Sequence, residues 1–341
     1  MAARHRVKLA RLLVDWYQKS HRDLPWRRTS DPYRIWVSEI MLQQTRSQAA
    51  VPYYERFLER FPTAGALAAA SEEEVLALWS GLGYYSRARN LWRAARQVVE
   101  AGGFPREYQA IRALAGVGDY TAAAIASIAF GFPHAVVDGN VMRVVARLQA
   151  DSGDIASART RERFRATAQA WLDPRQPGAF NQALMELGAT VCLPKNPLCP
   201  VCPLAACCVA RQQGIAAQLP VKSRKTEPVE IAAVLLLVRK GGRALLRRTE
   251  AGSRRMAGFW ELPSPEQLPG ARIGKSIGEF RHTITHHHYT FTVKTAWGRA
   301  AGAEFAWFAP AHLAEIPLST TARKALHLAM QPIGSGPHCS P

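Results

Sequence analysis

Five of the six cysteines in this 341-residue chain lie within residues 192–208, CLPKNPLCPVCPLAACC. Four of them follow the spacing C-x6-C-x2-C-x5-C: Cys192, Cys199, Cys202 and Cys208. Four thiolates in one loop can hold zinc or an iron–sulfur cluster. Zinc sites usually pair two short Cys knuckles on either side of a longer finger. Because this separation is missing, the spacing favours a cluster over zinc or unligated thiols. Cys207 has no assigned role.

A second kind of chemistry is suggested by Glu39, which lies in RIWVSEIMLQQT. Ile35 and Leu42 fall on the same stripe of the expected helix. Burial on an apolar stripe raises the pKa of a carboxyl, so that it stays protonated and can act as an acid. The alternative is a partly exposed glutamate that reaches solvent.

Asp138 lies in AVVDGNVMRVVARL, directly before a segment with helical periodicity. Asp138 or Asn140 can simply cap that helix. The same position favours an ionised aspartate, because a helix start attracts negative charge. One carboxyl with a raised pKa and a second one held ionised is the arrangement that lets two acids play opposite roles.

A Gly-x-Gly turn separates two expected helices in LAGVGDYTAAAI, the first ending at Leu114 and the second beginning near Tyr120. Gly116 and Gly118 permit positive φ angles and a close approach of the backbone to a partner. The N–H groups that open the second helix then suit a phosphate. A plain helix connection is the alternative, but the basic charge of this half favours contact with a DNA backbone.

The formal net charge is +18, with 27 Lys or Arg against 18 Asp or Glu up to residue 212 and 17 against 8 beyond it. Charge spread over both halves favours nucleic acid as partner, the alternative being an Arg-rich composition inherited from a GC-rich genome. The longest apolar run, residues 232–238, is too short to cross a bilayer, and no apolar leader segment follows the basic amino end. We therefore expect a cytosolic protein without a membrane partner.

The elements that position these residues are expected to be all-α over residues 1–212, where Ala-rich stretches alternate with Gly and Pro punctuation. Residues 213–229 are typical of a linker, 230–331 of an α+β domain, and 332–341 of a disordered tail that contains Cys339. Within the α+β domain, two apolar runs joined by Gly-Gly predict a hairpin, HHYTFTVKTAWG predicts a strand, and STTARKALHLAM predicts a capped helix.

Together these segments resemble the MutY-type adenine DNA glycosylases, a branch of the helix–hairpin–helix glycosylases. The resemblance is carried by LPWR, WVSEIMLQQTR, GLGYYSRARNL, LAGVGDYTA, AVVDGNVMRV, FNQALMELGA and the cysteine loop, and it covers nearly the whole chain. It implies a helix–hairpin–helix at about residues 111–130 and a 4Fe–4S cluster in the cysteine loop. The implied partner is double-stranded DNA with adenine opposite 8-oxoguanine or guanine. We further expect a monomer in the bacterial cytosol or nucleoid.

The resemblance implies hydrolysis of the N-glycosidic bond of an adenine that is turned out of the duplex. Glu39 would protonate the base and later activate water, and Asp138 would stabilise the cationic sugar. Tyr120 and Asn140 match supporting hydrogen-bond partners. In the related endonuclease III type a lysine stands at the position of Tyr120 and forms a Schiff base. A phenol cannot do so, which implies a monofunctional enzyme that leaves an abasic site.

Further matching positions imply contacts with the base and the duplex. The adenine pocket is implied at Trp26, Arg27, Leu42 and Gln182. Gln44 and Tyr84 match residues that wedge into the duplex where the base has left.

Residues 230–331 resemble the family's Nudix-like domain, which recognises 8-oxoguanine. Thr285 and His286 fall where the family presents a Ser-His pair to the oxidised base, and Ile284 replaces the family's more frequent Phe. Nucleotide hydrolysis is not expected here, because a Nudix hydrolase holds magnesium with an R-E-x-x-E-E helix. Between GFWELP and FRHT only Glu266 and Glu279 are acidic.

Two other functions stay open from the sequence. One is a different helix–hairpin–helix glycosylase, acting on oxidised pyrimidines or thymine mispairs, and Tyr120 with the Nudix-like half argues against it. The other is a non-catalytic protein that binds DNA lesions. The presence of both Glu39 and Asp138 argues against that function.

Overall fold

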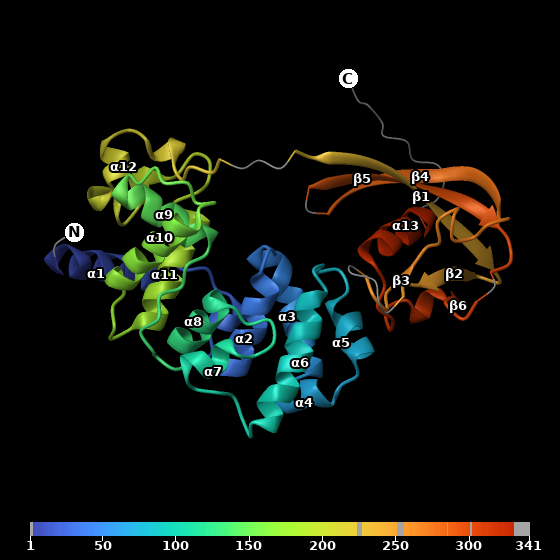
Figure 1. The fold of residues 1–341 in the computed structure, drawn as a ribbon, viewed down its shortest axis with the longest axis horizontal. Helices are drawn as coiled ribbons and strands as arrows, with labels where there is room; N and C mark the ends of the chain where they lie inside the picture. The colour runs from blue at the N-terminus through green and yellow to red at the C-terminus, as the bar shows by residue number, and fades with distance from the viewer. Residues whose placement is uncertain (1–2, 224–226, 251–255, 285, 301, 331–341) are drawn as a thin grey trace. The chain divides into compact units, whose positions relative to one another are not determined.

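The computed structural model describes residues 3–223, 227–250, 256–284, 286–300 and 302–330 (Figure 1). The α-helices are α1 (Ala3–Ser20), α2 (Pro32–Leu42), α3 (Ser47–Arg60), α4 (Ala64–Ala69), α5 (Glu72–Trp79), α6 (Ser86–Glu100), α7 (Tyr108–Arg112), α8 (Asp119–Ile128), α9 (Gly139–Gln149), α10 (Ala158–Trp171), α11 (Pro177–Thr190), α12 (Val209–Gln212) and α13 (Thr320–Met330). The strands are β1 (Val229–Lys240), β2 (Arg243–Arg248), β3 (Trp260–Glu261), β4 (Arg272–Ile284), β5 (His287–Trp297) and β6 (Phe305–Phe308). Short 3-10 turns are η1 (Pro25–Arg27), η2 (Cys199–Val201), η3 (Ala205–Cys207), η4 (Ala216–Gln218) and η5 (Pro310–His312).

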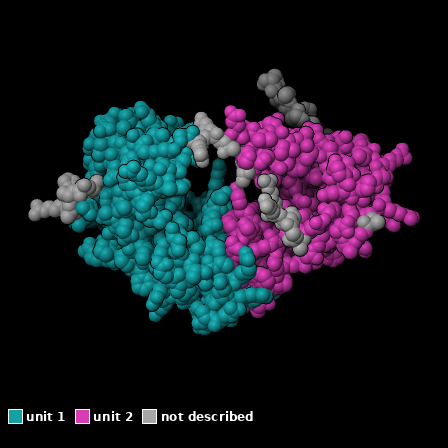
Figure 2. All heavy atoms as spheres, viewed as in Figure 1, with its two compact units in different colours: residues 1–68, 93–225 teal, residues 69–92, 226–341 magenta. Residues whose placement is uncertain are grey.

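The chain divides into two compact units, each built from two stretches of sequence (Figure 2). The described residues of 1–68 and 93–225 form unit 1, and those of 69–92 and 226–341 form unit 2. The segment 69–92 thus belongs with the carboxyl-terminal residues, which the linear order of helices does not reveal. In the part of the chain that the structure describes, no helix has the length and apolar character needed to span a membrane.

Unit 1 is helical, and the predicted all-α fold is confirmed. Helices α1, α9, α10 and α11 share one apolar core, to which Leu13, Val144, Phe164 and Leu187 contribute fully buried side chains. Their burial follows from the helical spacing of apolar residues, which gives each helix one stripe to bury. Of the residues that could do chemistry, Asp138 lies at the start of α9, whereas Glu39 lies within α2 and Tyr120 in the first turn of α8.

Helices α7 and α8 are joined by the tight turn that the sequence predicts. Gly116 adopts a φ of 75°, which favours glycine, and Gly118 caps α8 in an extended conformation. The N–H of Val117 donates to the carbonyl of Leu114 at 3.0 Å and closes the turn. Both glycines are exposed, so the backbone N–H groups at the start of α8 face outward.

Unit 2 contains a six-stranded mixed sheet in the order β3-β2-β1-β5-β4, with β6 paired to β2. Strands β1 and β5 are parallel, and the other neighbours are antiparallel. The predicted β1–β2 hairpin is confirmed, and its turn places Gly241 and Gly242 at φ values of 56° and 74°, as hairpin turns of this length require. The strand predicted from HHYTFTVKTAWG is β5.

Helix α13 packs on this sheet and completes the predicted α+β architecture. Its first turn is capped by Ser319, whose Oγ accepts a hydrogen bond from the N–H of Ala322 at 3.0 Å, so the expected serine cap is confirmed. Ala322 and Leu326 are buried in one cluster with Leu237 of β1 and Val293 of β5.

Candidate active site and cysteine loop

Glu39 is buried in α2, with 5% of its surface exposed. Its Oε2 atom has no hydrogen-bond partner among the described residues. Burial raises the pKa of Glu39 to about 7, the negative charge of Asp138 adds to the rise, and the Tyr120 hydroxyl and the Arg27 cation oppose it. The predicted burial and raised pKa of Glu39 are confirmed. These interactions connect α2 and the neighbouring η1 with α8 and the start of α9, which come much later in the sequence.

Asp138 caps α9 and is held by the helix that it opens. Its Oδ1 accepts from the N–H of Val141 at 2.7 Å, and its Oδ2 accepts from Nδ2 of Asn140 at 2.9 Å. Burial nevertheless raises the pKa of Asp138, against these hydrogen bonds and the charge of Arg143. The expectation that the helix start alone would hold this pKa down is therefore wrong, because loss of solvent outweighs the cap.

The two carboxyls are still not equivalent. Asp138 accepts from two directed donors and has Arg143 nearby. Glu39 has the Tyr120 hydroxyl and the charge of Arg27, but its Oε2 atom has no hydrogen-bond partner among the described residues. A proton shared between two close acids resides on the one whose anion is less well solvated. Of the two acids, Glu39 is therefore the one that holds a proton more readily as the pH approaches neutrality. Burial also raises the pKa of Tyr120 far above its ordinary value, so this phenol stays neutral, and it donates to Sδ of Met185 at 3.3 Å.

Two of the predicted base-pocket residues, Arg27 and Gln182, contact Tyr17, and a third, Trp26, packs on Tyr54. Trp26 is buried in η1 and packs edge-on against Tyr54, with ring centroids 5.3 Å apart. The guanidinium of Arg27 lies 5.4 Å from the centroid of the Tyr17 ring, and the Tyr17 hydroxyl donates to Oε1 of Gln182 at 3.2 Å. The fourth, Leu42, is the last residue of α2 and is half-buried.

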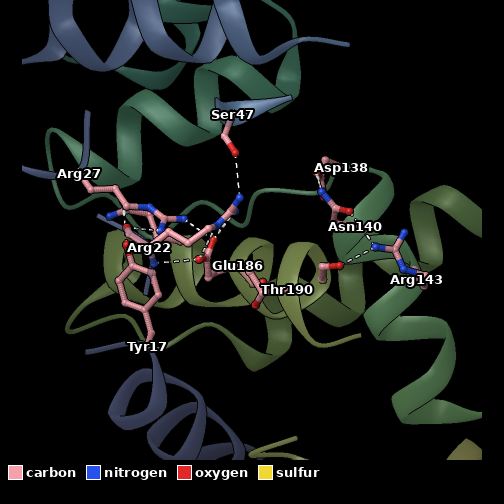
Figure 3. Close-up of polar contacts among 11 residues, drawn as sticks. Tyr17, Arg22, Arg27, Ser47, Asp138, Asn140, Arg143, Glu186 and Thr190 are labelled. Carbon is pink, nitrogen blue, oxygen red and sulfur yellow. Dashed lines mark hydrogen bonds and ion pairs between the residues drawn. The ribbon is translucent and has the colours of Figure 1, made fainter. Parts of the chain in front are cut away.

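Sequence reasoning missed Glu186, the carboxylate that fixes Arg27. Its side chain is fully buried in α11 and accepts from Arg22 through the backbone N–H (3.0 Å), Nε (2.8 Å) and Nη2 (2.7 Å). Arg27 adds a fourth bond from Nη2 at 2.6 Å (Figure 3). Burial alone would raise the pKa of Glu186, but the two arginines lower it to about 2. The sequence signal was the one used for Glu39, a carboxylate within an apolar helical stretch.

The two predicted wedge residues share an unusual backbone. Gln44 has a φ of 58° and Tyr84 a φ of 49°, and both side chains are exposed. A positive φ is uncommon for residues other than glycine and often marks a functional site. Gln44 follows α2 in unit 1, and Tyr84 belongs to unit 2. Thr285 lies outside the described residues, and His286 is half-buried with its ring 4.0 Å from that of His287.

The four spaced cysteines line one cavity together with apolar side chains such as Leu148 and Leu204. Cys207 is not among its lining residues. Arg147 enters the same cavity, and its Nη1 donates to Sγ of Cys192 at 3.3 Å. Within the described ranges, no group of three or more His, Cys, Asp or Glu side chains is arranged to hold a metal ion. The four thiols thus share one apolar cavity.

Besides Arg147, the buried Arg143 was also missed from the sequence, and it connects the cysteine loop to Asp138 of the carboxyl pair. Arg143 donates from Nε to the carbonyl of Cys192 at 2.7 Å and from Nη2 to Oδ1 of Asn140 at 2.8 Å. Asn140 in turn donates to Asp138. One line of hydrogen bonds therefore runs from the cysteine loop to the cap of α9, and Figure 3 shows its members Arg143, Asn140 and Asp138. The close approach of Gly188 to Asn140, where a Cβ would lie 2.6 Å from the Asn140 Cβ, gives α11 a reason to carry glycine.

Comparisons with known proteins agree with this arrangement. Residues 37–171 match the model of the HhH-GPD superfamily base excision DNA repair proteins. The adenine DNA glycosylase of Homo sapiens is 37% identical over 82% of this chain and 65% of its own length, and that of Mus musculus is 37% identical over 82% and 69%. A solved thermostable thymine-DNA glycosylase superposes with a TM-score of 0.56 at 28% identity, over 61% of this chain and 97% of its own.

This chain spans just under two thirds of the human relative's length. Its buried carboxyl pair and its helix–turn–helix lie in the segment that matches the superfamily model. The chain therefore belongs to the adenine DNA glycosylase family of the helix–hairpin–helix superfamily.

Proposed function

We propose that this chain is a base-excision-repair glycosylase that removes adenine paired with 8-oxoguanine or guanine. The observation that carries the proposal is the buried Glu39, whose raised pKa is coupled to Asp138 and Tyr120. The names of the relatives, adenine DNA glycosylase, support the choice of base. The pKa of Glu39, about 7, suits a general acid at neutral pH.

In the proposed reaction, Glu39 transfers its proton to a ring nitrogen of the extruded adenine and makes it a better leaving group. The C–N bond then breaks with its electron pair on the base, and the carboxylate of Asp138 stabilises the cationic sugar. Asn140 and the cap of α9 hold Asp138 in place. Glu39, now ionised, takes a proton from the incoming water, which bonds to the sugar and leaves an abasic site.

Tyr120 supports a monofunctional reaction. A glycosylase that also nicks the strand needs an amine to form a Schiff base with the sugar. The neutral phenol of Tyr120 cannot form one. The same reasoning disfavours a lyase acting on oxidised pyrimidines.

The cysteine cavity supports a resident 4Fe–4S cluster held by Cys192, Cys199, Cys202 and Cys208. Its donor set consists of four thiols, its walls are apolar, and Arg147 brings a positive donor to one sulfur, which suits a thiolate-ligated group of negative charge. A cluster bound there would organise the loop, and no step of the reaction needs it. We further propose that residues 230–331 act as the Nudix-like domain that recognises the base opposite the adenine. We also propose that residues 213–229 link the domains, and that the chain works as a monomer on DNA in the bacterial cytosol or nucleoid.

The proposal is tested with a duplex that carries adenine opposite 8-oxoguanine, with adenine opposite thymine as control. The expected result is cleavage of the adenine strand only after alkali, and none in the thymine control. Cleavage without alkali would indicate a lyase. The Glu39→Gln variant should bind the mispaired duplex while releasing no base. If the wild-type chain binds the mispair but releases no adenine, the alternative of a lesion-binding protein takes its place.

A further inference from the structure

The turn that carries Tyr84 has an uncommon backbone conformation, which other residues must stabilise. Gly81, Gly83 and Tyr84 have φ values of 109°, 71° and 49°. The Tyr84 side chain is 44% exposed, which is unusual for a large aromatic ring. A left-handed backbone at tyrosine persists only where its surroundings impose it.

The first restraint on this turn comes from within the segment. Arg87 is buried, and its Nη2 donates to the carbonyls of Leu82 at 3.3 Å and Gly83 at 3.0 Å. The indole of Trp79 donates to the same Gly83 carbonyl at 3.2 Å. These donors satisfy carbonyls that the turn directs inward, and so they fix its shape.

The second restraint comes from helix α13, more than 230 positions further along the chain. Ser80, which precedes the turn, is 2% exposed. Its Oγ donates to the carbonyl of Leu318 and accepts from Nη2 of Arg323 at 2.7 Å. A buried hydroxyl with one donor and one acceptor is fully satisfied, and the bond from arginine is charge-assisted.

Tyr85, the residue after Tyr84, adds a third restraint. The centroid of its ring lies 3.9 Å from that of Phe259, and its hydroxyl lies 3.4 Å from Oγ1 of Thr320. The residues that receive the turn belong to the sheet, because Leu318 forms a bridge with Trp260 of β3. The turn and the sheet therefore belong to one compact unit (Figure 2).

We propose that Ser80 and Arg323 are positioning residues which make unit 2 itself present Tyr84 to the duplex. The inference rests on the proposed function, in which Tyr84 fills the gap left by the extruded base. His286, which precedes β5, belongs to the same unit. Recognition of the opposite base and insertion of Tyr84 into the duplex are then coupled, because both depend on unit 2. Loosening the Ser80–Arg323 contact weakens base extrusion and leaves the carboxyl pair in unit 1 unaltered.

The test measures extrusion directly, with 2-aminopurine in place of the target adenine opposite 8-oxoguanine. Its fluorescence rises when it leaves the stack. The full chain is used with Glu39→Gln, so that the base is not cleaved. Arg323→Gln, Ser80→Ala and Tyr84→Ala should each lower the fluorescence rise of the bound duplex about fivefold to tenfold. Arg323→Lys, which keeps a cationic donor, should restore most of it.

Arg272→Gln serves as the matched control, because it removes the same charge from an exposed residue at the start of β4. It should leave the fluorescence unchanged. Equal fluorescence in wild type and Arg323→Gln, with Tyr84→Ala reduced, would overturn the inference while leaving the proposed function intact. Absence of any rise with the otherwise unaltered chain would count against the proposed function and the inference together.

Discussion

Replacing Glu186 by Gln keeps the shape of the side chain but removes the charge that two arginines share. Because the side chain is fully buried, its interaction with Arg22 and Arg27 is little screened by solvent. A lowering of the Glu186 pKa from 4.5 to about 2 corresponds to about 3 kcal/mol of folding free energy. Removal of one partner from a buried ion pair costs a similar amount, about 3–5 kcal/mol. We therefore expect the Gln variant to be about 3 kcal/mol less stable at pH 7.

The pH dependence separates this charge effect from a packing defect. The folded-state pKa of Glu186 is lowered, so its charge stabilises the fold fully above the unfolded-state pKa of 4.5. This stabilisation is lost as the pH falls toward the folded-state pKa of about 2. Urea unfolding of unit 1, followed by tryptophan fluorescence, should give a wild-type advantage of about 3 kcal/mol at pH 7 that shrinks to about half of that at pH 3. Glu59→Gln, an exposed carboxylate of α3, is the matched control and should change stability by less than about 0.5 kcal/mol. A constant difference at both pH values, or one below about 1 kcal/mol at pH 7, would refute the reasoning.

Three other predictions concern the proposed chemistry. Glu39→Gln should lower the single-turnover rate of adenine release by at least about 10²-fold, because the acid is lost, while gel-shift affinity for the mispair stays within about threefold; parallel loss of both would contradict the assigned role. Asp138→Asn should slow release by about 10²- to 10³-fold with a melting temperature near that of wild type, since Asn caps a helix as well as Asp; an unfolded variant would instead indicate a mainly structural aspartate. Cys199→Ser should reduce bound iron and visible absorbance, whereas Cys207→Ser should not, and equal iron in both variants would reject the assigned ligands.

Local pattern was sufficient to predict the helical first half of the chain, the β1–β2 hairpin, strand β5 and helix α13, and to single out Glu39 and Asp138 as candidate acids. The apolar stripe around Glu39 predicted its burial, and the sequence before α9 predicted the cap by Asp138. The direction of the Asp138 pKa was wrong, because burial depends on what packs over a helix start and not on the helix itself.

The missed features all depend on contacts between distant parts of the chain. Arg27 and Glu186 are 159 positions apart, and Ser80 and Leu318 are 238 positions apart. No periodicity in one sequence connects such pairs, so neither the Glu186 anchor nor the membership of residues 69–92 in unit 2 could be predicted. Arg143 and Arg147 are similar, since their partners are carbonyls and a sulfur of a loop that has no regular pattern.

The central claim is that a neutral Glu39 lies beside an ionised Asp138. It is tested most directly by infrared titration of the free protein, in which the wild-type spectrum minus that of Glu39→Gln isolates the carbonyl stretch of one protonated carboxyl. The account predicts that this band persists at pH 6 and disappears with a midpoint at about pH 7. A band that has already disappeared by pH 5 would show an ordinary, ionised glutamate and would contradict the account.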